Sequence, residues 1–200
     1  MSKISKIRAR QVFDSRGNPT IEAEVHSKKL SASAICPSGA STGTYEAFEK
    51  RDTKNKRYLG KSVFSAINLI NTKISKKLSG TNIHDQVRID TTLINLDGTR
   101  QKTNLGANAI LAVSMAAKKL SAKIKNVPLY KTFLVKNKYR LPYPLMNIIN
   151  GGAHANNGLR IQEFMIRPDK AKSFSEAMRM CFLVISNLRN LIVKKGLSTS

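Results

Sequence analysis

Tryptophan is absent from this 200-residue chain, and only two of its residues are cysteines. Cys36 and Cys181 are far apart in the sequence, each in an apolar neighbourhood, so we expect reduced, buried thiols and no disulfide. No apolar run approaches the roughly 20 residues that a membrane-spanning helix requires. Residues 1–6 are not followed by an apolar block or a small-residue cleavage site, so we expect no secretory signal. These absences predict a cytoplasmic protein with no membrane partner.

Acidic side chains are also scarce. The chain has 12 Asp and Glu against 35 Lys and Arg, a formal net charge of +23, which raises the hypothesis of a polyanion-binding protein. The lysines are spread along the chain, without a run of five basic residues or aromatic residues placed among them as a stacking platform. We therefore expect no dedicated nucleic-acid site. A basic, non-catalytic binding fragment with generic affinity for polyanions remains the alternative function.

The first part of the chain has the pattern of a small antiparallel sheet. Residues 4–13 are strand-like, and residues 14–19 are dense in turn-forming types. Residues 21–25 alternate apolar and polar side chains, the period of a half-buried strand, and residues 31–36 alternate again. Pro37 ends this third strand because proline has no N–H to donate to a sheet.

Helical periodicity begins at Ser62. Apolar residues recur every three or four positions up to residue 78, which predicts a helix that Ser62 caps and Gly80 ends. Residues 85–96 and 105–125 predict two further helices, and residues 128–135 a short one. Residues 1–138 are therefore expected to form an α+β domain, an antiparallel meander followed by helices that cover one of its faces.

A second pattern begins after the stiff Leu-Pro-Tyr-Pro junction at 141–144. Residues 145–149 and 161–167 predict two adjacent strands, and a helix then begins at Ser173, with Glu176 at the capping-box position, and ends at Gly196. Two strands and one helix are too little to bury both faces of a sheet. We therefore expect residues 139–200 to be the incomplete beginning of a larger barrel domain.

Three residues around the glycine turn of this second region can carry chemistry. His154 follows Gly151 and Gly152, and Gln162 and Glu163 come one strand later. Because a strand–turn–strand unit brings both of its ends to one side, we expect His154 and Glu163 to line one pocket. The alternatives are a structural histidine and, for a carboxylate among apolar neighbours, a compensating lysine or arginine.

The segment 38–44, Ser-Gly-Ala-Ser-Thr-Gly-Thr, is a second candidate. Its small residues allow the backbone to approach a ligand closely, and its hydroxyls can reach a hard cation or a phosphate. It is not a Walker A motif, because the Gly-Lys-Ser/Thr ending is absent. An ordinary surface turn is the alternative interpretation.

Six segments, in order and at family-like separations, together resemble the enolase family. They are residues 12–20 (VFDSRGNPT), 38–43 (SGASTG), 58–61 (YLGK), 96–99 (LDGT), 105–111 (LGANAIL) and 150–166 (NGGAHANNGLRIQEFMI). Several motifs in register are far more specific than any one of them. The resemblance implies an α/β protein in which the N-terminal α+β domain is joined to the opening strands and helix of an enolase-type (β/α) barrel, truncated here.

The resemblance also implies a function, the reversible dehydration of 2-phosphoglycerate to phosphoenolpyruvate in glycolysis and gluconeogenesis. The family's enzymes are Mg²⁺-dependent lyases, and a cytoplasmic homodimer is implied at full length. By resemblance, Ser41 would bind the metal, and Gly39 and Ala40 would contact the substrate in a loop that closes over it.

The same resemblance implies that His154, Gln162 and Glu163 bind the substrate, and that His154 and Glu163 are catalytic. The family's base lysine, acid glutamate and metal-binding carboxylates have no match before Ser200, so we expect the chain to be inactive alone. Arg160 departs from the family pattern, in which an acidic residue is expected before the Gln-Glu-Phe segment.

Overall fold

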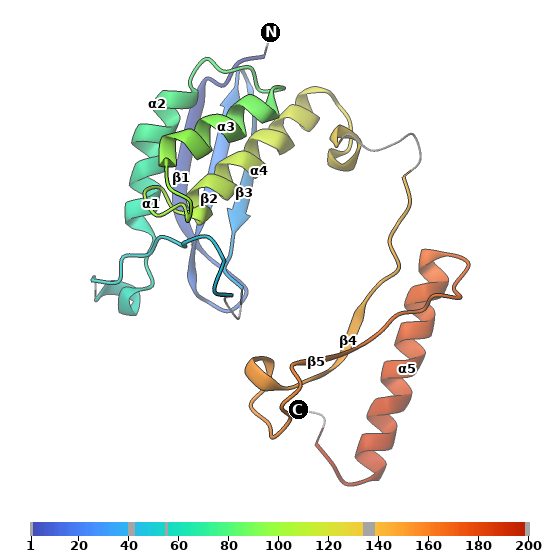
Figure 1. The fold of residues 1–200 in the computed structure, drawn as a ribbon. Helices are drawn as coiled ribbons and strands as arrows, with labels where there is room; N and C mark the ends of the chain where they lie inside the picture. Colours follow the sequence, from blue (N-terminus) through green and yellow to red (C-terminus); the bar gives the residue numbers. More distant parts are fainter. Residues whose placement is uncertain (1, 40–42, 55, 134–138, 199–200) are drawn as a thin grey trace. The chain divides into compact units, whose positions relative to one another are not determined.

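A computed structural model describes residues 2–39, 43–54, 56–133 and 139–198 (Figure 1). The chain divides into two compact units between residues 134 and 135. The domain boundary predicted between residues 138 and 139 adjoins the segment 134–138, which lies outside the described residues.

The first unit opens with the predicted three-stranded meander. Its strands are β1 (Lys6–Phe13), β2 (Pro19–Ser27) and β3 (Leu30–Cys36), paired antiparallel in the order β1-β2-β3. The alternation in β2 has the predicted consequence: Ile21 and Val25 are fully buried, whereas Glu22 on the opposite face forms an ion pair of 2.7 Å with Arg10 of β1.

Helices lie on one side of this sheet (Figure 1). The helix predicted from Ser62 is present with a π-helical turn in its middle, and the two helices predicted after it are also present. Their bounds, with the short 3₁₀ turns, are η1 (Arg57–Gly60), α1 (Phe64–Leu69), η2 (Ile70–Ile74, the π turn), α2 (Ser75–Leu78), α3 (Gln86–Asp97), α4 (Ala107–Ile124) and η3 (Leu129–Thr132).

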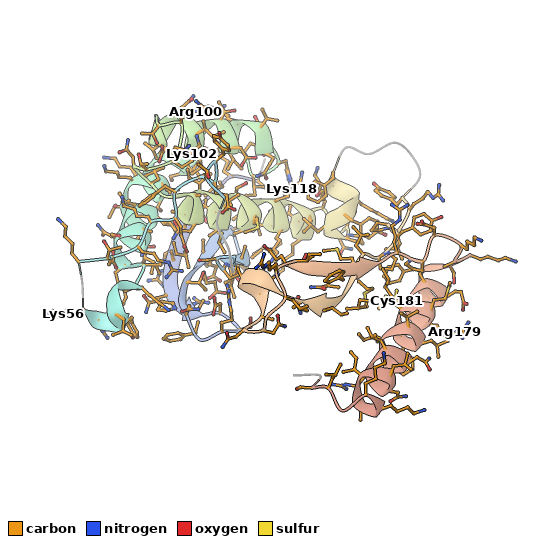
Figure 2. The ribbon with its side chains drawn as sticks, turned by 60° about the horizontal axis from the view of Figure 1, so that its bottom comes forward. Lys56, Arg100, Lys102, Lys118, Arg179 and Cys181 are labelled. Carbon is orange, nitrogen blue, oxygen red and sulfur yellow. The ribbon has the colours of Figure 1, made fainter. Side chains whose placement is uncertain are left out.

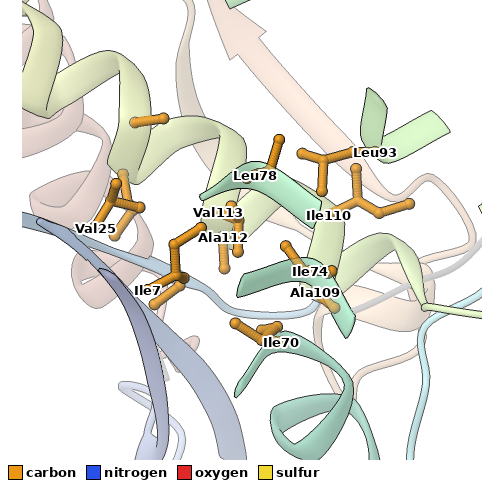
Figure 3. Packing of buried hydrophobic residues seen from close by; sticks show 14 of the residues in the cluster. Ile7, Val25, Ile70, Ile74, Leu78, Leu93, Ala109, Ile110, Ala112 and Val113 are labelled. Atoms are coloured by element: carbon orange, nitrogen blue, oxygen red, sulfur yellow. The ribbon is translucent and has the colours of Figure 1, made fainter. Parts of the chain in front are cut away.

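The core of the first unit lies between the sheet and these helices (Figure 3). Ile70, Ile74 and Leu78 are fully buried at the predicted helical spacing. Each such side chain contributes roughly 1.5–3 kcal/mol through removal of apolar surface from water. Alanines on α4, including Ala109 and Ala112, are also fully buried, which allows this helix to pack closely on its neighbours.

The prediction that Ser62 caps the first helix is wrong. Asp52, from the preceding loop, accepts hydrogen bonds from the backbone N–H groups of Phe64 (2.8 Å) and Ser65 (3.1 Å). The Ser62 hydroxyl donates to the same carboxylate (2.9 Å). The cap is therefore supplied from ten or more residues upstream, and Ser62 supports it indirectly.

The second unit contains the two predicted strands and the predicted helix. Strands β4 (Met146–Asn150) and β5 (Glu163–Ile166) pair antiparallel around the short turn η4 (Gly152–His154), and α5 (Phe174–Lys194) follows. The Ser173 side chain accepts a hydrogen bond from the Glu176 N–H, as the capping box predicted.

Burial in the second unit is slight. In α5, only Ala177 and Cys181 are buried (Cys181 is labelled in Figure 2), whereas Phe182 is 64% exposed.

Both cysteines are free, as predicted, but Cys36 is only half-buried. Its partial burial raises the pKa of the thiol, and Glu49 makes a smaller contribution in the same direction. Within the described residues, no helix is both long and apolar enough to cross a membrane.

Candidate active-site residues

The glycine pair after β4 brings two segments into close contact. Gly151 donates its N–H to the carbonyl of Gln162 (2.9 Å), and Gly152 donates to that of Leu159 (2.8 Å). A Cβ atom at Gly151 would lie 2.3 Å from the carbonyl oxygen of Ile161, and Gly152 has a φ of +53°. Both positions therefore favour glycine, one because of space and the other because of backbone conformation.

This turn places the three predicted side chains together. His154 Nδ1 lies 2.9 Å from Glu163 Oε1, and His154 Nε2 lies 3.0 Å from Gln162 Nε2. The His154 and Glu163 side chains are 23% and 29% exposed, so they are shielded from solvent but still accessible. Glu163 contacts this histidine, rather than the lysine or arginine of the alternative interpretation.

The contacts fit two protonation patterns of the imidazole, one for each orientation of the Gln162 amide. The carboxylate at Nδ1 can only accept, so Nδ1 carries the proton; the Gln162 amide nitrogen is a donor, so Nε2 accepts. The neutral Nδ1–H tautomer satisfies both contacts. A reversed Gln162 amide would present its oxygen to a doubly protonated ring instead. His154 can thus hold a proton against Glu163 and orient that carboxylate.

A cavity of about 680 Å³ lies nearby in the same unit. Its lining comes from β4, the loop after it, α5 and the residues that follow α5, and includes Asn150, Phe182 and Ile185. The lining is mostly apolar, and His154, Gln162 and Glu163 do not belong to it. This cavity is therefore not the candidate site.

The other predicted site residues belong to the first unit. Gly39 is exposed, and Ala40 and Ser41 lie outside the described residues. Residues on both sides of the segment form side-chain hydrogen bonds. Arg51 Nη2 donates to the Ser38 hydroxyl (2.8 Å), and the N–H of Gly43 donates to Glu46 Oε1 (2.8 Å).

The sequence motifs did not predict a role for Arg51. Its guanidinium also donates to Glu49 Oε1 (2.8 Å) and to the carbonyl of Pro19 (3.1 Å), so it ties the end of the loop to β2. The sequence contains one indication of these contacts. Two of its only 12 acidic residues, Glu46 and Glu49, lie close to the loop.

The described residues alone do not make a metal site. Among them, no group of three or more His, Cys, Asp and Glu side chains is arranged to hold a metal ion. Of His154 and Glu163, only Glu163 offers the oxygen donors that Mg²⁺ prefers.

Comparison with known proteins matches both units. The family model described as "Enolase, N-terminal domain" matches residues 4–133, and the one described as "Enolase, C-terminal TIM barrel domain" matches residues 138–200. A protein named enolase from Pelagibacter ubique (strain HTCC1062) is 88% identical over 200 residues, which is 100% of this chain and 48% of that relative. The chain thus spans about half the length of this curated relative.

Proposed function

The chain belongs to the enolase family, and on that premise we propose that the protein it forms part of interconverts 2-phosphoglycerate and phosphoenolpyruvate. The reaction is a reversible dehydration, catalysed by a carbon–oxygen lyase of glycolysis and gluconeogenesis. The observation that carries the proposal is the contact between His154, Gln162 and Glu163, three side chains that one glycine turn holds together. We propose further that the whole protein is a cytoplasmic homodimer.

In this proposal Glu163 and His154 are the catalytic residues of the present chain. Glu163 acts in proton transfer at the side of the substrate from which hydroxide leaves, and His154 holds that carboxylate through the 2.9 Å contact at Nδ1. Gln162 completes the substrate-binding group by fixing the imidazole from the other side at 3.0 Å. Neither catalytic side chain is fully buried, as access by a substrate requires.

The loop that includes Gly39, Ala40 and Ser41, in the first unit, is proposed as a second group of functional residues. Gly39 and Ala40 would contact the substrate, and the Ser41 hydroxyl would contribute to Mg²⁺ binding. Bound Mg²⁺ would stabilise the negative charge that develops on the substrate carboxylate. The contact of Arg51 with Ser38 supports this proposal, because Arg51 also binds the carbonyl of Pro19 and so holds one end of the loop to β2.

Substitution in the full-length protein tests the catalytic pair. Glu163→Gln keeps the size of the side chain but removes the proton-accepting carboxylate, so we expect kcat to fall by about 10²–10⁴-fold. The matched control is Glu176→Gln, which removes an exposed carboxylate that pairs with Arg179 in the same unit, and should leave kcat within about twofold. Production of phosphoenolpyruvate, followed by its absorbance, is the measurement. An undiminished kcat in Glu163→Gln would refute the assigned role.

Removal of divalent cations tests the metal dependence separately. We expect a chelator to abolish turnover by the full-length protein and added Mg²⁺ to restore it, because the developing charge would otherwise lack a counterion. The control is the same chelator after an excess of Mg²⁺ has been added. Full activity at chelator excess would show that the cofactor assignment is wrong.

A further inference from the structure

The sheet of the first unit has two outer edges, β1 and β3. An edge strand presents unpaired N–H and C=O groups that can pair with another extended chain. Strand β3, with the sequence LSASAIC, has no charged residue, proline or glycine. Such a segment favours addition of a further strand, and its most available partner is the same segment of a second copy.

Two lysines of α4 cover the outer edge of β3. Lys123 Nζ donates to the carbonyl of Ser31 (3.0 Å), and Lys119 Nζ donates to that of Ser33 (3.2 Å). Both carbonyls face away from β2, because the hydrogen-bonding direction alternates along an antiparallel strand. Lysines four positions apart on a helix are separated by about 6 Å, and carbonyls two positions apart on a strand by about 6.8 Å. The two spacings match well enough for each lysine to reach one carbonyl.

The lysines also place positive charge at this edge. Antiparallel pairing of two β3 strands would bring the lysines of both copies together, and like charges in close approach repel. Lys118, on the same helix (Figure 2), instead donates to the carbonyl of Thr132 (2.9 Å), so it does not take part in covering β3.

A single amide side chain pairs with one residue, Ala9, at the outer edge of β1. The N–H of Ala9 donates to Asn71 Oδ1 (2.7 Å), and Asn71 Nδ2 donates to the carbonyl of Ala9 (3.2 Å). A carboxamide offers the same donor and acceptor as a peptide group, so Asn71 pairs with β1 as a strand residue would. Asn71 lies on the π-helical turn η2.

We infer that Asn71, Lys119 and Lys123 close the two edges of the sheet and prevent a second copy of this chain from adding to it through β3. The inference is independent of catalytic activity, because it rests on contacts within the first unit alone. It assigns β3 as a latent self-association surface that α4 keeps covered.

Hydrogen exchange at single amides of the 200-residue chain tests the β3 edge. The N–H groups of Ser31 and Ser33 share the outward direction of their carbonyls, and strand addition would protect them. In the double variant Lys119→Ala/Lys123→Ala, we expect their exchange to slow by about tenfold or more as the chain is concentrated. In the parent chain, exchange at these amides should not depend on concentration.

Matched variants separate edge uncovering from loss of charge. Lys76→Ala/Lys77→Ala removes the same charge from α2 and should behave as the parent. Lys119→Arg/Lys123→Arg retains donors at the edge and should also behave as the parent. Concentration-dependent protection in the control, or its absence in a folded Lys119→Ala/Lys123→Ala variant, would overturn the inference. Unchanged exchange of the α4 amides verifies that the alanine variant is folded. If the alanine variant does not fold, the arginine variant decides: concentration-dependent protection of its Ser31 and Ser33 amides overturns the inference, and the absence of that protection supports it.

The β1 edge has its own test within the same unit. Asn71→Ala should speed exchange of the Ala9 amide by about tenfold or more, because its acceptor is lost. Asn71→Asp retains an acceptor oxygen and should preserve the protection. Asn68→Ala, three positions earlier on the same helix, is the control. Unchanged exchange of Ala9 in Asn71→Ala would show that the side chain does not close this edge.

Discussion

Asp97 is the clearest case of a buried charge that the surrounding backbone stabilises. The residue is 2% exposed, and its carboxylate accepts hydrogen bonds from the Leu105 N–H (2.7 Å), the Thr99 N–H (3.0 Å) and the Thr99 hydroxyl. Burial alone would raise the pKa of Asp97, but these hydrogen bonds outweigh it and hold the pKa below its ordinary value. The carboxylate therefore fixes the loop between α3 and α4 in its ionised form.

We predict that Asp97→Ala lowers the free energy of unfolding by about 2–4 kcal/mol at neutral pH, because three donors lose a charged acceptor. A carboxyl group whose pKa is lowered in the folded state stabilises the fold at pH values above its ordinary pKa, about 3.9. This contribution is lost as the pH falls through the pKa of the folded state. The difference between parent and variant should therefore shrink in acid. Urea denaturation at several pH values measures it, with Asp97→Asn as the variant that keeps an acceptor. A difference independent of pH would contradict the prediction.

At the scale of elements, the N-terminus of α1 shows what local patterns miss. Ser62 is a typical cap residue in a typical position, but the cap comes from Asp52, which lies 12 residues before Phe64. A window of a few residues contains no sign of that contact. The π turn η2 was hidden for a different reason: Ile70 and Ile74 are four positions apart, a spacing that also suits an ordinary α-helix.

Asp52→Ala should therefore destabilise the first unit by about 1–2 kcal/mol, the usual cost of an N-cap. Ser62→Ala should cost less, because it removes one hydrogen bond to Asp52 and leaves both helix N–H groups capped. Burial alone would raise the pKa of Asp52, but hydrogen bonds from Ser65 and Ser62 outweigh it and lower this pKa. The destabilisation caused by Asp52→Ala should therefore diminish as acid protonates the carboxylate. Thermal unfolding of the two variants measures this, and an equal or larger loss in Ser62→Ala would restore serine as the cap.

Strands and site geometry were more accessible to prediction, for a physical reason. Alternation in residues 21–25 reports burial directly, and a hairpin must bring its two ends together, so the proximity of His154 and Glu163 follows from the glycine turn. The role of Arg51 did not follow, because its partners come from segments separated in sequence, including Pro19 and Ser38. Contacts within one hairpin can be predicted from the sequence, whereas contacts between separate secondary-structure elements depend on the completed fold.

At the scale of the whole molecule, the high positive charge is partly used inside the fold. Lys118, Lys119 and Lys123 of α4 all donate to backbone carbonyls of the first unit. These contacts do not require an external polyanion. These three lysines therefore have structural partners within the described residues, whereas their positive charge is retained because a carbonyl is neutral.

The two units also differ in how well they bury their helices. Helix α4, of 18 residues, has Val113 and Leu120 fully buried, whereas α5, of 21 residues, buries only Ala177 and Cys181. Exchange of a helical amide requires local opening, and opening costs more where more apolar surface must be exposed. We predict that α4 amides of the 200-residue chain exchange at least about 100-fold more slowly than α5 amides. The two helices control for each other in one hydrogen-exchange experiment on a dilute sample. Equal protection would mean that α5 gains its stability from contacts other than those of the second unit.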